Sequence, residues 1–280
     1  MIRHTLHELE AFLTEDVPFH DLSADAIGAS GSSEISYFTR DTGVACGTED
    51  VARMAEVLGL RMTGSVHSGD RIAPGDVFLS AEGSTEAIFA IWKVGQNLLD
   101  RSSGIATAAR RWRDALDEAG HAIPVLVTRK VLPGAKKLMT KATIAGGLVP
   151  HRLGVSETIL FFDQHITAAG GRERFISMLP QIRRTHIEKK IIVETSELAF
   201  AEKFLAAGAD GIQLEKLSPT AVRELTETLR PQFEDAVLLV AGGVTLANCI
   251  DYATAGVDGL VTSAVYQAPP LDIGVRIEPV

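Results

Sequence analysis

The chain has 280 residues, enough for one large domain or two modest ones with cores that need no metal or disulfide. Its 36 acidic residues outnumber 27 basic ones, and the net charge of −9 argues against a protein that wraps nucleic acid or lies on anionic lipid. The only cysteines are Cys46 and Cys249, which excludes a framework of several disulfides and favours a reducing compartment.

Neither the N-terminal stretch nor the apolar runs indicate export or membrane insertion. His4, His7 and Glu8 interrupt the region where an export signal needs an unbroken apolar segment. The longest apolar runs, such as residues 237–244, are far too short to cross a bilayer. We therefore expect a cytoplasmic protein without a membrane partner.

The first 120 residues predict a mixture of helices and strands without a regular order. Apolar residues at helical spacing predict a helix over 4–14, which ends at Asp16-Val17-Pro18. Further elements follow from apolar patterning and turn residues: strands over 34–40 and 43–46, a helix over 49–58, and strands over 61–67 and 77–81. A long helix is predicted over 84–118, with an interruption around Ser102, Ser103 and Gly104.

From residue 121 onward, short apolar runs alternate with helical patterns. Strands are predicted over 123–127, 158–161, 191–193, 211–214, 237–240 and 260–261, with helices near 134–145, 171–184, 196–206, 218–229 and 245–255. This alternation is typical of a parallel sheet, and the segment is too short for eight strand–helix units. We therefore expect a short or open α/β barrel, followed by a tail strand over 271–277 that returns to the N-terminal domain.

Polar, charged or glycine residues follow each of these predicted strands. They are Arg129 and Lys130, Asp163 to His165, Glu194, Glu215 and Lys216, Gly242 and Gly243, and Thr262 and Ser263. Because reactive groups of parallel α/β folds gather just past the carboxyl ends of the strands, these positions are the candidate active site.

Residues 129–156 contain six lysines and arginines and no carboxylate, in a chain that is acidic overall. Lys136, Lys137 and Lys141 fit a solvated helix face equally well. The loop cations are Arg129, Lys130, His151 and Arg152, and cations in loops can converge on a phosphate-rich or carboxylate-rich ligand.

Two further patterns point to phosphorylated ligands. A strand that ends at Ala241 and continues as Gly242-Gly243 suggests a phosphate cradle, supported by Thr262-Ser263 after the next strand, although Gly-Gly also suits a tight turn. Glu194 and Glu215 could hold ribose hydroxyls or a hydrated Mg²⁺. Alternatively, these carboxylates pair with nearby lysines.

A series of motifs resembles the quinolinate (type II nicotinate-nucleotide) phosphoribosyltransferases over nearly the whole chain. They are Glu-Asp-Val-Pro-Phe-His-Asp-Leu-Ser at 15–23, Asn-Leu-Leu at 97–99, Ser-Gly-Ile-Ala-Thr at 103–107, Thr-Arg-Lys-Val-Leu-Pro-Gly at 128–134, Gly-Gly at 146–147, His-Arg at 151–152, Asp-Gln-His at 163–165, and Pro-Leu-Asp-Ile at 270–273.

The resemblance implies an α/β fold of two domains. An N-terminal α/β sandwich over 1–105, completed by the tail 266–280, would precede an open, incomplete α/β barrel over 106–265. The resemblance also implies a homodimer whose active sites are completed by the neighbouring subunit. Its substrates would be phosphoribosyl pyrophosphate, with Mg²⁺, and a small heterocyclic acceptor.

The resemblance also assigns roles to residues. Arg129, His151 and Arg152 would surround the acceptor, together with Lys93, Phe162 and His165. Lys130, Glu194 and Glu215 would face phosphoribosyl pyrophosphate as the catalytic residues. The loops formed by Ala241, Gly242 and Gly243 and by Thr262 and Ser263 would hold its 5-phosphate.

Several positions depart from the quinolinate enzymes. Trp92-Lys93 stands where they carry an arginine, Phe162 replaces a lysine, Gln164 an asparagine, and Glu215 an aspartate, while Ala241 replaces a serine. These changes resemble the ModD branch, whose association with molybdenum transport rests on its name. Because one acceptor-site cation is lost at Phe162, we expect quinolinate to be a poor substrate.

The chemistry of phosphoribosyl transfer fits these residue types, because cations, Mg²⁺ and backbone N–H groups must neutralise a leaving polyanion. Two other classes of function stay open from the sequence. A protein that binds a phosphorylated nucleotide or an oxyanion would keep the pocket without turnover. A Schiff-base lyase would use Lys130 or Lys216 as its amine.

Overall fold

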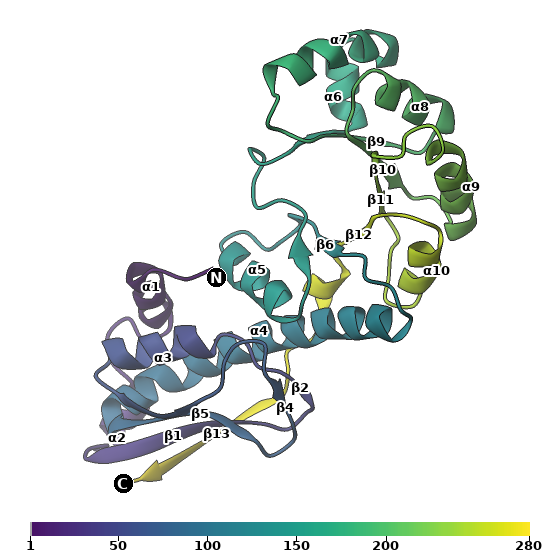
Figure 1. Cartoon of the computed structure of the whole chain (residues 1–280). Coiled ribbons are helices and arrows are strands. Elements are labelled where there is room, and N and C mark those ends of the chain that lie inside the picture. Colours follow the sequence, from purple (N-terminus) through teal and green to yellow (C-terminus); the bar gives the residue numbers. More distant parts are fainter. Residues whose placement is uncertain (1) are drawn as a thin grey trace. The chain divides into compact units, whose positions relative to one another are not determined.

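The computed structural model describes residues 2–280, which form two compact units (Figure 1). The first unit comprises the chain up to Arg111 together with Val131–Gly147 and Val265–Val280, and the second comprises Trp112–Lys130 and Leu148–Ala264. No helix among the described residues is long and apolar enough to span a bilayer.

The first unit contains an antiparallel sheet with the strand order β13-β1-β5-β3 and a small pair of strands, β2 and β4. Its strands are β1 (Ser32–Thr39), β2 (Gly43–Val44), β3 (Arg61–Ser65), β4 (Arg71–Ile72), β5 (Val77–Ser84) and β13 (Ile273–Pro279), and its helices are α1 (Leu6–Asp16), α2 (Leu22–Ala26), α3 (Thr48–Val57), α4 (Thr85–Glu118, up to Arg111), α5 (Lys136–Ala145) and the short 3₁₀ helix η1 (Ala264–Gln267, from Val265). The predicted return of the tail is confirmed, because Ile277 on β13 pairs with Ile35 on β1.

Helices α1, α3 and α4 bury apolar faces with one side of this sheet. Successive β1 residues alternate between buried and partly exposed, which places Ile35 and Tyr37 in the core. Leu9, Met54 and Ile88 come from the three helices and are fully buried in the same cluster. This packing of helices against an antiparallel sheet confirms the predicted α/β sandwich.

The long helix α4 is continuous, so the interruption predicted at Ser102, Ser103 and Gly104 is wrong. These small residues instead allow close packing within the first unit. The Ser102 hydroxyl donates to the Cys46 carbonyl at 2.7 Å, and the Cys46 N–H donates to the Ser103 hydroxyl at 3.0 Å. A side chain at Gly104 would collide with the carbonyl oxygen of Pro269.

Helix α5 packs with the first unit, whereas the sequence analysis included it in the barrel. Its Lys141 is buried, with its ammonium 2.8 Å from Glu49 and 2.9 Å from Asp50. His4 approaches the same Asp50 carboxylate at 3.2 Å. Burial would raise the pKa of Asp50, but the contacts with His4 and Lys141 outweigh it and hold this pKa below its ordinary value. These ion pairs anchor α5 to the first unit.

The second unit is a parallel sheet with the order β7-β6-β12-β11-β10-β9-β8. Its strands are β6 (Val125–Val127), β7 (Val149–Pro150), β8 (Ile159–Phe161), β9 (Ile191–Thr195), β10 (Gly211–Glu215), β11 (Val237–Ala241) and β12 (Gly259–Thr262), and its helices are α6 (Asp163–Ala168), α7 (Arg172–Thr185), α8 (Leu198–Ala206), α9 (Pro219–Leu229) and α10 (Cys249–Thr254). Since β7 and β8 are edge strands, the sheet does not close, and the predicted open barrel is confirmed.

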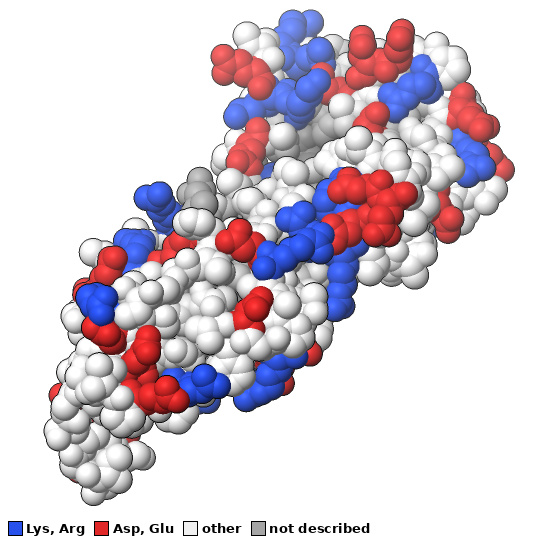
Figure 2. Space-filling model, turned by 60° about the horizontal axis from the view of Figure 1, so that its bottom comes forward, with Lys and Arg blue, Asp and Glu red and all other residues white. Residues whose placement is uncertain are grey.

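The helices of this unit follow the outer, convex side of its curved sheet (Figure 1). Strand residues that alternate toward them, such as Ile212 and Leu214, are completely buried. Side chains on the inner side of the sheet form an apolar layer that includes Leu239 and Val261. Near the carboxyl ends of the strands, the side chains on this inner side are polar. On the face of the molecule that Figure 2 shows, acidic and basic groups lie side by side. One ion pair of the second unit joins Arg230 and Asp258 at 2.9 Å.

Candidate active site

A cavity of about 790 Å³ lies within the second unit, at the carboxyl ends of its strands. Most predicted site residues line it: Arg129, Lys130, His151, Arg152, Phe162, Glu194, Glu215, Ala241, Gly242, Gly243, Thr262 and Ser263. A cavity of this size accommodates a small-molecule ligand.

Two predicted site residues are not among those that line the cavity. His165 stacks on Phe162 with a ring separation of 5.8 Å, and its Nδ1 accepts the Phe162 backbone N–H at 3.1 Å, so it supports Phe162 from behind. Lys93 lies on α4 in the first unit, where its ammonium donates to Gln96 at 2.9 Å and lies over the Trp92 ring. Its predicted role at the acceptor stays a prediction.

The cationic side of the cavity comes from the loops after β6 and β7. Lys130 is exposed, and its backbone N–H donates to the Thr128 hydroxyl at 3.2 Å. His151 is held by its backbone N–H, which donates to the Val127 carbonyl at 2.9 Å. These backbone contacts fix the loops and leave cationic side chains directed at the cavity.

The cations of this group are close enough to influence one another. Burial and the Arg152 charge lower the pKa of His151, which favours a neutral imidazole. Burial and the Arg129 charge likewise lower the pKa of Arg152, although a guanidinium stays charged at any physiological pH. Such clustered positive charge is favourable only with an anion between its members.

The carboxylate side is formed by Glu194 on β9 and Glu215 on β10, which are neighbouring strands. Burial raises the pKa of Glu194, and the negative charges of Glu215 and Asp163 raise it further. A donor from Gln213 and the charge of Lys216 partly oppose these effects. The pair therefore gains from an added cation or hydroxyl donor.

Gln213 is a site residue that the sequence analysis missed. It is only 4% exposed, lies directly beside Glu194 in the strand register, and donates to the Glu194 carboxylate at 2.5 Å. Its own amide oxygen is buried without a hydrogen-bond partner among the described residues. The available signal was strand periodicity, because residues 213 and 215 of one strand share a face.

The predicted glycine loop forms part of the cavity wall, but its geometry differs from the expected one. Gly242 and Gly243 both have left-handed backbones, with φ of +78° and +82°. The helix expected to begin at 245 begins only at Cys249, because the Asn248 side chain accepts the Thr245 N–H and organises an intervening turn. Any anion at this loop would therefore meet turn N–H groups rather than a helix N-terminus.

Among the carboxylates that line the cavity, Glu194 and Glu215 lie on neighbouring strands and are the candidate metal ligands. Across residues 2–280, no cluster of three or more His, Cys, Asp and Glu side chains forms a metal site. Mg²⁺, however, is commonly held by one or two carboxylates and the phosphates of a substrate. The oxygen donors of Glu194 and Glu215 therefore fit a Mg²⁺ ion that binds together with a phosphorylated ligand.

Comparisons with known proteins show the family to which this chain belongs. Residues 21–103 match the N-terminal domain of quinolinate phosphoribosyl transferase, and residues 105–276 match its C-terminal domain. The chain belongs to the quinolinate phosphoribosyl transferase family. This is a family of pentosyltransferases, so the sequence-based assignment to it is confirmed.

Relatives within the quinolinate phosphoribosyl transferase family include two kinds of pyrophosphorylase. A Rhodobacter capsulatus protein named “Putative pyrophosphorylase ModD” is 34% identical over 86% of this chain and 92% of its own length. The human nicotinate-nucleotide pyrophosphorylase [carboxylating] is 28% identical over 96% of this chain and 91% of its own length. The crystal structure of NadC from Streptococcus pyogenes superposes with a TM-score of 0.88 at 26% identity and covers both chains completely.

Proposed function

We propose that this chain transfers phosphoribose from phosphoribosyl pyrophosphate to a ring nitrogen of a small heterocycle. The observation that carries the proposal is a single cavity in which loop cations, two carboxylates and a glycine loop converge. In the reaction, the bond between C1 of the ribose and the pyrophosphate oxygen breaks, and pyrophosphate leaves with the electron pair. The ring nitrogen then supplies the electrons of the new C1–N bond.

Under this proposal, the residues that contact phosphoribosyl pyrophosphate divide into three groups. Lys130 neutralises the leaving pyrophosphate, and Glu194 and Glu215 face the ribose hydroxyls and its positively charged transition state. The Gly242-Gly243 loop, with Ala241 and Ser263, binds the 5-phosphate, and Thr262 contributes by positioning these loops. The Thr262 hydroxyl donates to the Val244 carbonyl and accepts the Ala264 N–H, so it holds the loops rather than the ligand.

Mg²⁺ is part of the proposal as a companion of the pyrophosphate. When bound, it would supply positive charge to the leaving group, held by Glu194 and Glu215. The chain's own residues orient the two reactants.

The acceptor is proposed to be a nitrogen heterocycle with fewer negative charges than quinolinate. Arg129, His151 and Arg152 supply its cationic contacts, but His151 tends toward neutrality and Phe162 adds an apolar ring to the wall. Loss of one charge-assisted contact costs about 1.5–3 kcal/mol, or roughly ten- to hundredfold in affinity.

This acceptor proposal is tested by kcat/KM with quinolinate for the wild type and for Phe162→Lys. We expect a low value for the wild type and an increase of about ten- to hundredfold for the variant. A wild-type value above about 10⁴ M⁻¹s⁻¹ would contradict the proposal.

We propose that the transferase is a homodimer with shared active sites, as its resemblance to the quinolinate phosphoribosyltransferases implies. Support from the structure is an exposed apolar segment on the first unit, where Phe19, Leu22 and Ile27 are 91%, 73% and 74% exposed.

Calorimetry with phosphoribosyl pyrophosphate and Mg²⁺ tests the central function, and pyrophosphate release with a panel of nitrogen bases tests turnover. We expect binding by the wild type and a roughly ten- to hundredfold loss for Lys130→Ala, with an unchanged melting temperature. Absence of binding at saturating ligand would refute the proposal. Binding without pyrophosphate release from any base would instead favour a non-catalytic nucleotide-binding protein.

A further inference from the structure

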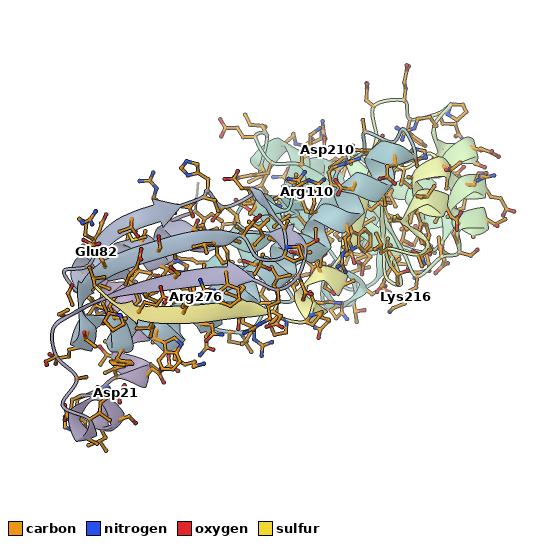
Figure 3. All side chains as sticks on the ribbon, turned by 90° about the horizontal axis from the view of Figure 1, so that it is seen from below. Asp21, Glu82, Arg110, Asp210, Lys216 and Arg276 are labelled. Carbon is orange, nitrogen blue, oxygen red and sulfur yellow. The ribbon has the colours of Figure 1, made fainter. Side chains whose placement is uncertain are left out.

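Lys216 has an unusual backbone conformation next to the carboxylate pair. Among the non-glycine residues that the structure describes, it alone has a positive φ, of 54°. This left-handed conformation costs a lysine roughly 1–2 kcal/mol, and asparagine or glycine would adopt it more readily. Asp210 and Lys216, both labelled in Figure 3, flank β10, so the conformation lies where this strand ends.

The conformation is maintained by contacts on both sides of the chain. The Lys216 N–H donates to the Ala241 carbonyl at 2.9 Å, which extends the pairing between β10 and β11 by one residue. The aliphatic part of the side chain lies on Gly242, where an added Cβ would be only 2.7 Å from the Lys216 Cγ. Gly242 therefore provides the space that this lysine occupies.

The ammonium of Lys216 is directed at the carboxylates of the cavity. Its Nζ lies 3.0 Å from the Glu215 carboxylate, and the side chain is 75% exposed and lines the cavity. An exposed ion pair contributes little to stability, so the pair with Glu215 does not offset the backbone cost. A strained residue beside a ligand cavity indicates a functional role.

We propose that Lys216 is the chain's own cation at the Glu194–Glu215 pair and that its ammonium contacts a phosphate of bound phosphoribosyl pyrophosphate. The inference rests on the proposed function and deepens it. Because an ammonium and a Mg²⁺ ion compete for the same carboxylate, Lys216 weakens metal binding to the empty pocket. It also carries part of the affinity for phosphoribosyl pyrophosphate when no metal is present.

The test compares Lys216→Asn with the wild type by calorimetry, with Mg²⁺ and with a chelator. Asparagine removes the charge and tolerates the left-handed backbone, so the variant should fold at least as stably. Without metal, we expect its affinity for phosphoribosyl pyrophosphate to fall about ten- to hundredfold. With Mg²⁺ the loss should be much smaller. Lys216→Arg should still bind phosphoribosyl pyrophosphate when the chelator is present. The control is Lys189→Asn, at an exposed lysine outside the cavity.

A second measurement is independent of the phosphorylated ligand. Titration with Mg²⁺ alone should show tighter binding by Lys216→Asn than by the wild type, because Glu215 loses its competing cation. If Lys216 were purely structural, its replacement would weaken the binding of both Mg²⁺ and phosphoribosyl pyrophosphate. Equal losses of phosphoribosyl pyrophosphate affinity with and without Mg²⁺, or unchanged Mg²⁺ binding, would overturn the inference. If the wild type does not bind phosphoribosyl pyrophosphate under either condition, the proposed function itself fails.

Discussion

The side-chain amide of Gln213 lies between the apolar layer of the barrel and the carboxylates of the cavity. Its nitrogen donates to Glu194, while its buried oxygen has no partner among residues 2–280. Leu239 is its register neighbour on the other side. A buried amide with an unused acceptor is costly in such surroundings. We infer that Gln213 serves the proposed ligand-binding role of Glu194, because its amide nitrogen donates to that carboxylate.

Replacement Gln213→Leu should therefore separate binding from stability. The variant removes an unsatisfied acceptor from an apolar layer, so the melting temperature should change little. Without its donor, Glu194 loses a charge-assisted bond worth about 1.5–3 kcal/mol, and affinity for phosphoribosyl pyrophosphate with Mg²⁺ should fall up to about a hundredfold. Calorimetry measures the affinity, and thermal melting measures the stability. Gln181→Leu, on the exposed surface of α7, is the control. Unchanged affinity in Gln213→Leu would argue that the amide is only part of the core.

At the scale of elements, helix α5 offers two lysines with opposite environments. The ammonium of Lys141 is buried between Glu49 and Asp50, whereas Lys137 forms an exposed pair with Glu8 at 2.7 Å. A buried ion pair contributes strongly only while both signs are present.

Lys141→Met should consequently destabilise the protein by about 3–5 kcal/mol, because it leaves the buried Asp50 and the partly buried Glu49 without the lysine charge. Lys137→Met makes the same substitution one turn earlier and should have a much smaller effect, because water screens the exposed pair. Urea unfolding of both variants measures the difference. Equal losses would mean that the buried network is not what anchors α5.

Element assignment from the sequence succeeded where apolar runs were unbroken. The six predicted barrel strands are all present, because burial on both sides of a parallel sheet produces such runs. The tail strand, predicted from alternating apolar and polar residues, is also present, in the antiparallel sheet. It failed where tertiary contacts decide, as at Ser102 to Gly104, whose small side chains indicated a break but permit close packing. The two-residue strands β4 and β7 and the six-residue helix α6 are too short for periodicity to indicate.

For the site, strand ends identified most residues that line the cavity, because parallel strands bring their carboxyl ends to one edge. Gln213 was overlooked because it lies inside an apolar run rather than after one. The conformation of Lys216 could not be predicted either, since a left-handed lysine depends on the space above Gly242.

At the scale of the whole molecule, stability should depend on pH through Asp100 of α4. Burial, with a smaller contribution from the Asp272 charge, raises the pKa of Asp100 to about 6, although the backbone of Ile273 opposes this. A raised pKa means that the folded state binds the proton more tightly than the unfolded state. The stabilisation is complete below the ordinary pKa of about 4 and is lost as the pH rises toward 6.

Asp100→Asn should remove this dependence. At pH 7 to 8 the neutral amide should stabilise the protein by about 1 kcal/mol, a value reduced for solvent screening because Asp100 is only partly buried. Below pH 4 the variant and the wild type should have similar stability. Urea unfolding across this pH range provides the measurement, with Asp114→Asn, farther along the same helix, as a control. A constant difference at all pH values would exclude titration of Asp100 as the cause.

An exposed apolar segment of the first unit predicts the association state of the protein. Phe19, Leu22 and Ile27 lie on and around α2 and expose apolar side chains within one short segment. Clustered exposed apolar groups of this kind mark contact surfaces, and a stable dimer buries about 800 Å² on each partner. We expect a dimeric mass by light scattering at micromolar concentration. Phe19→Ser combined with Leu22→Ser should shift the protein toward monomers, whereas Ile187→Ser, which changes an equally exposed residue of the second unit, should not. A monomeric wild type would refute the homodimer, and a dimer insensitive to the double substitution would place its interface elsewhere.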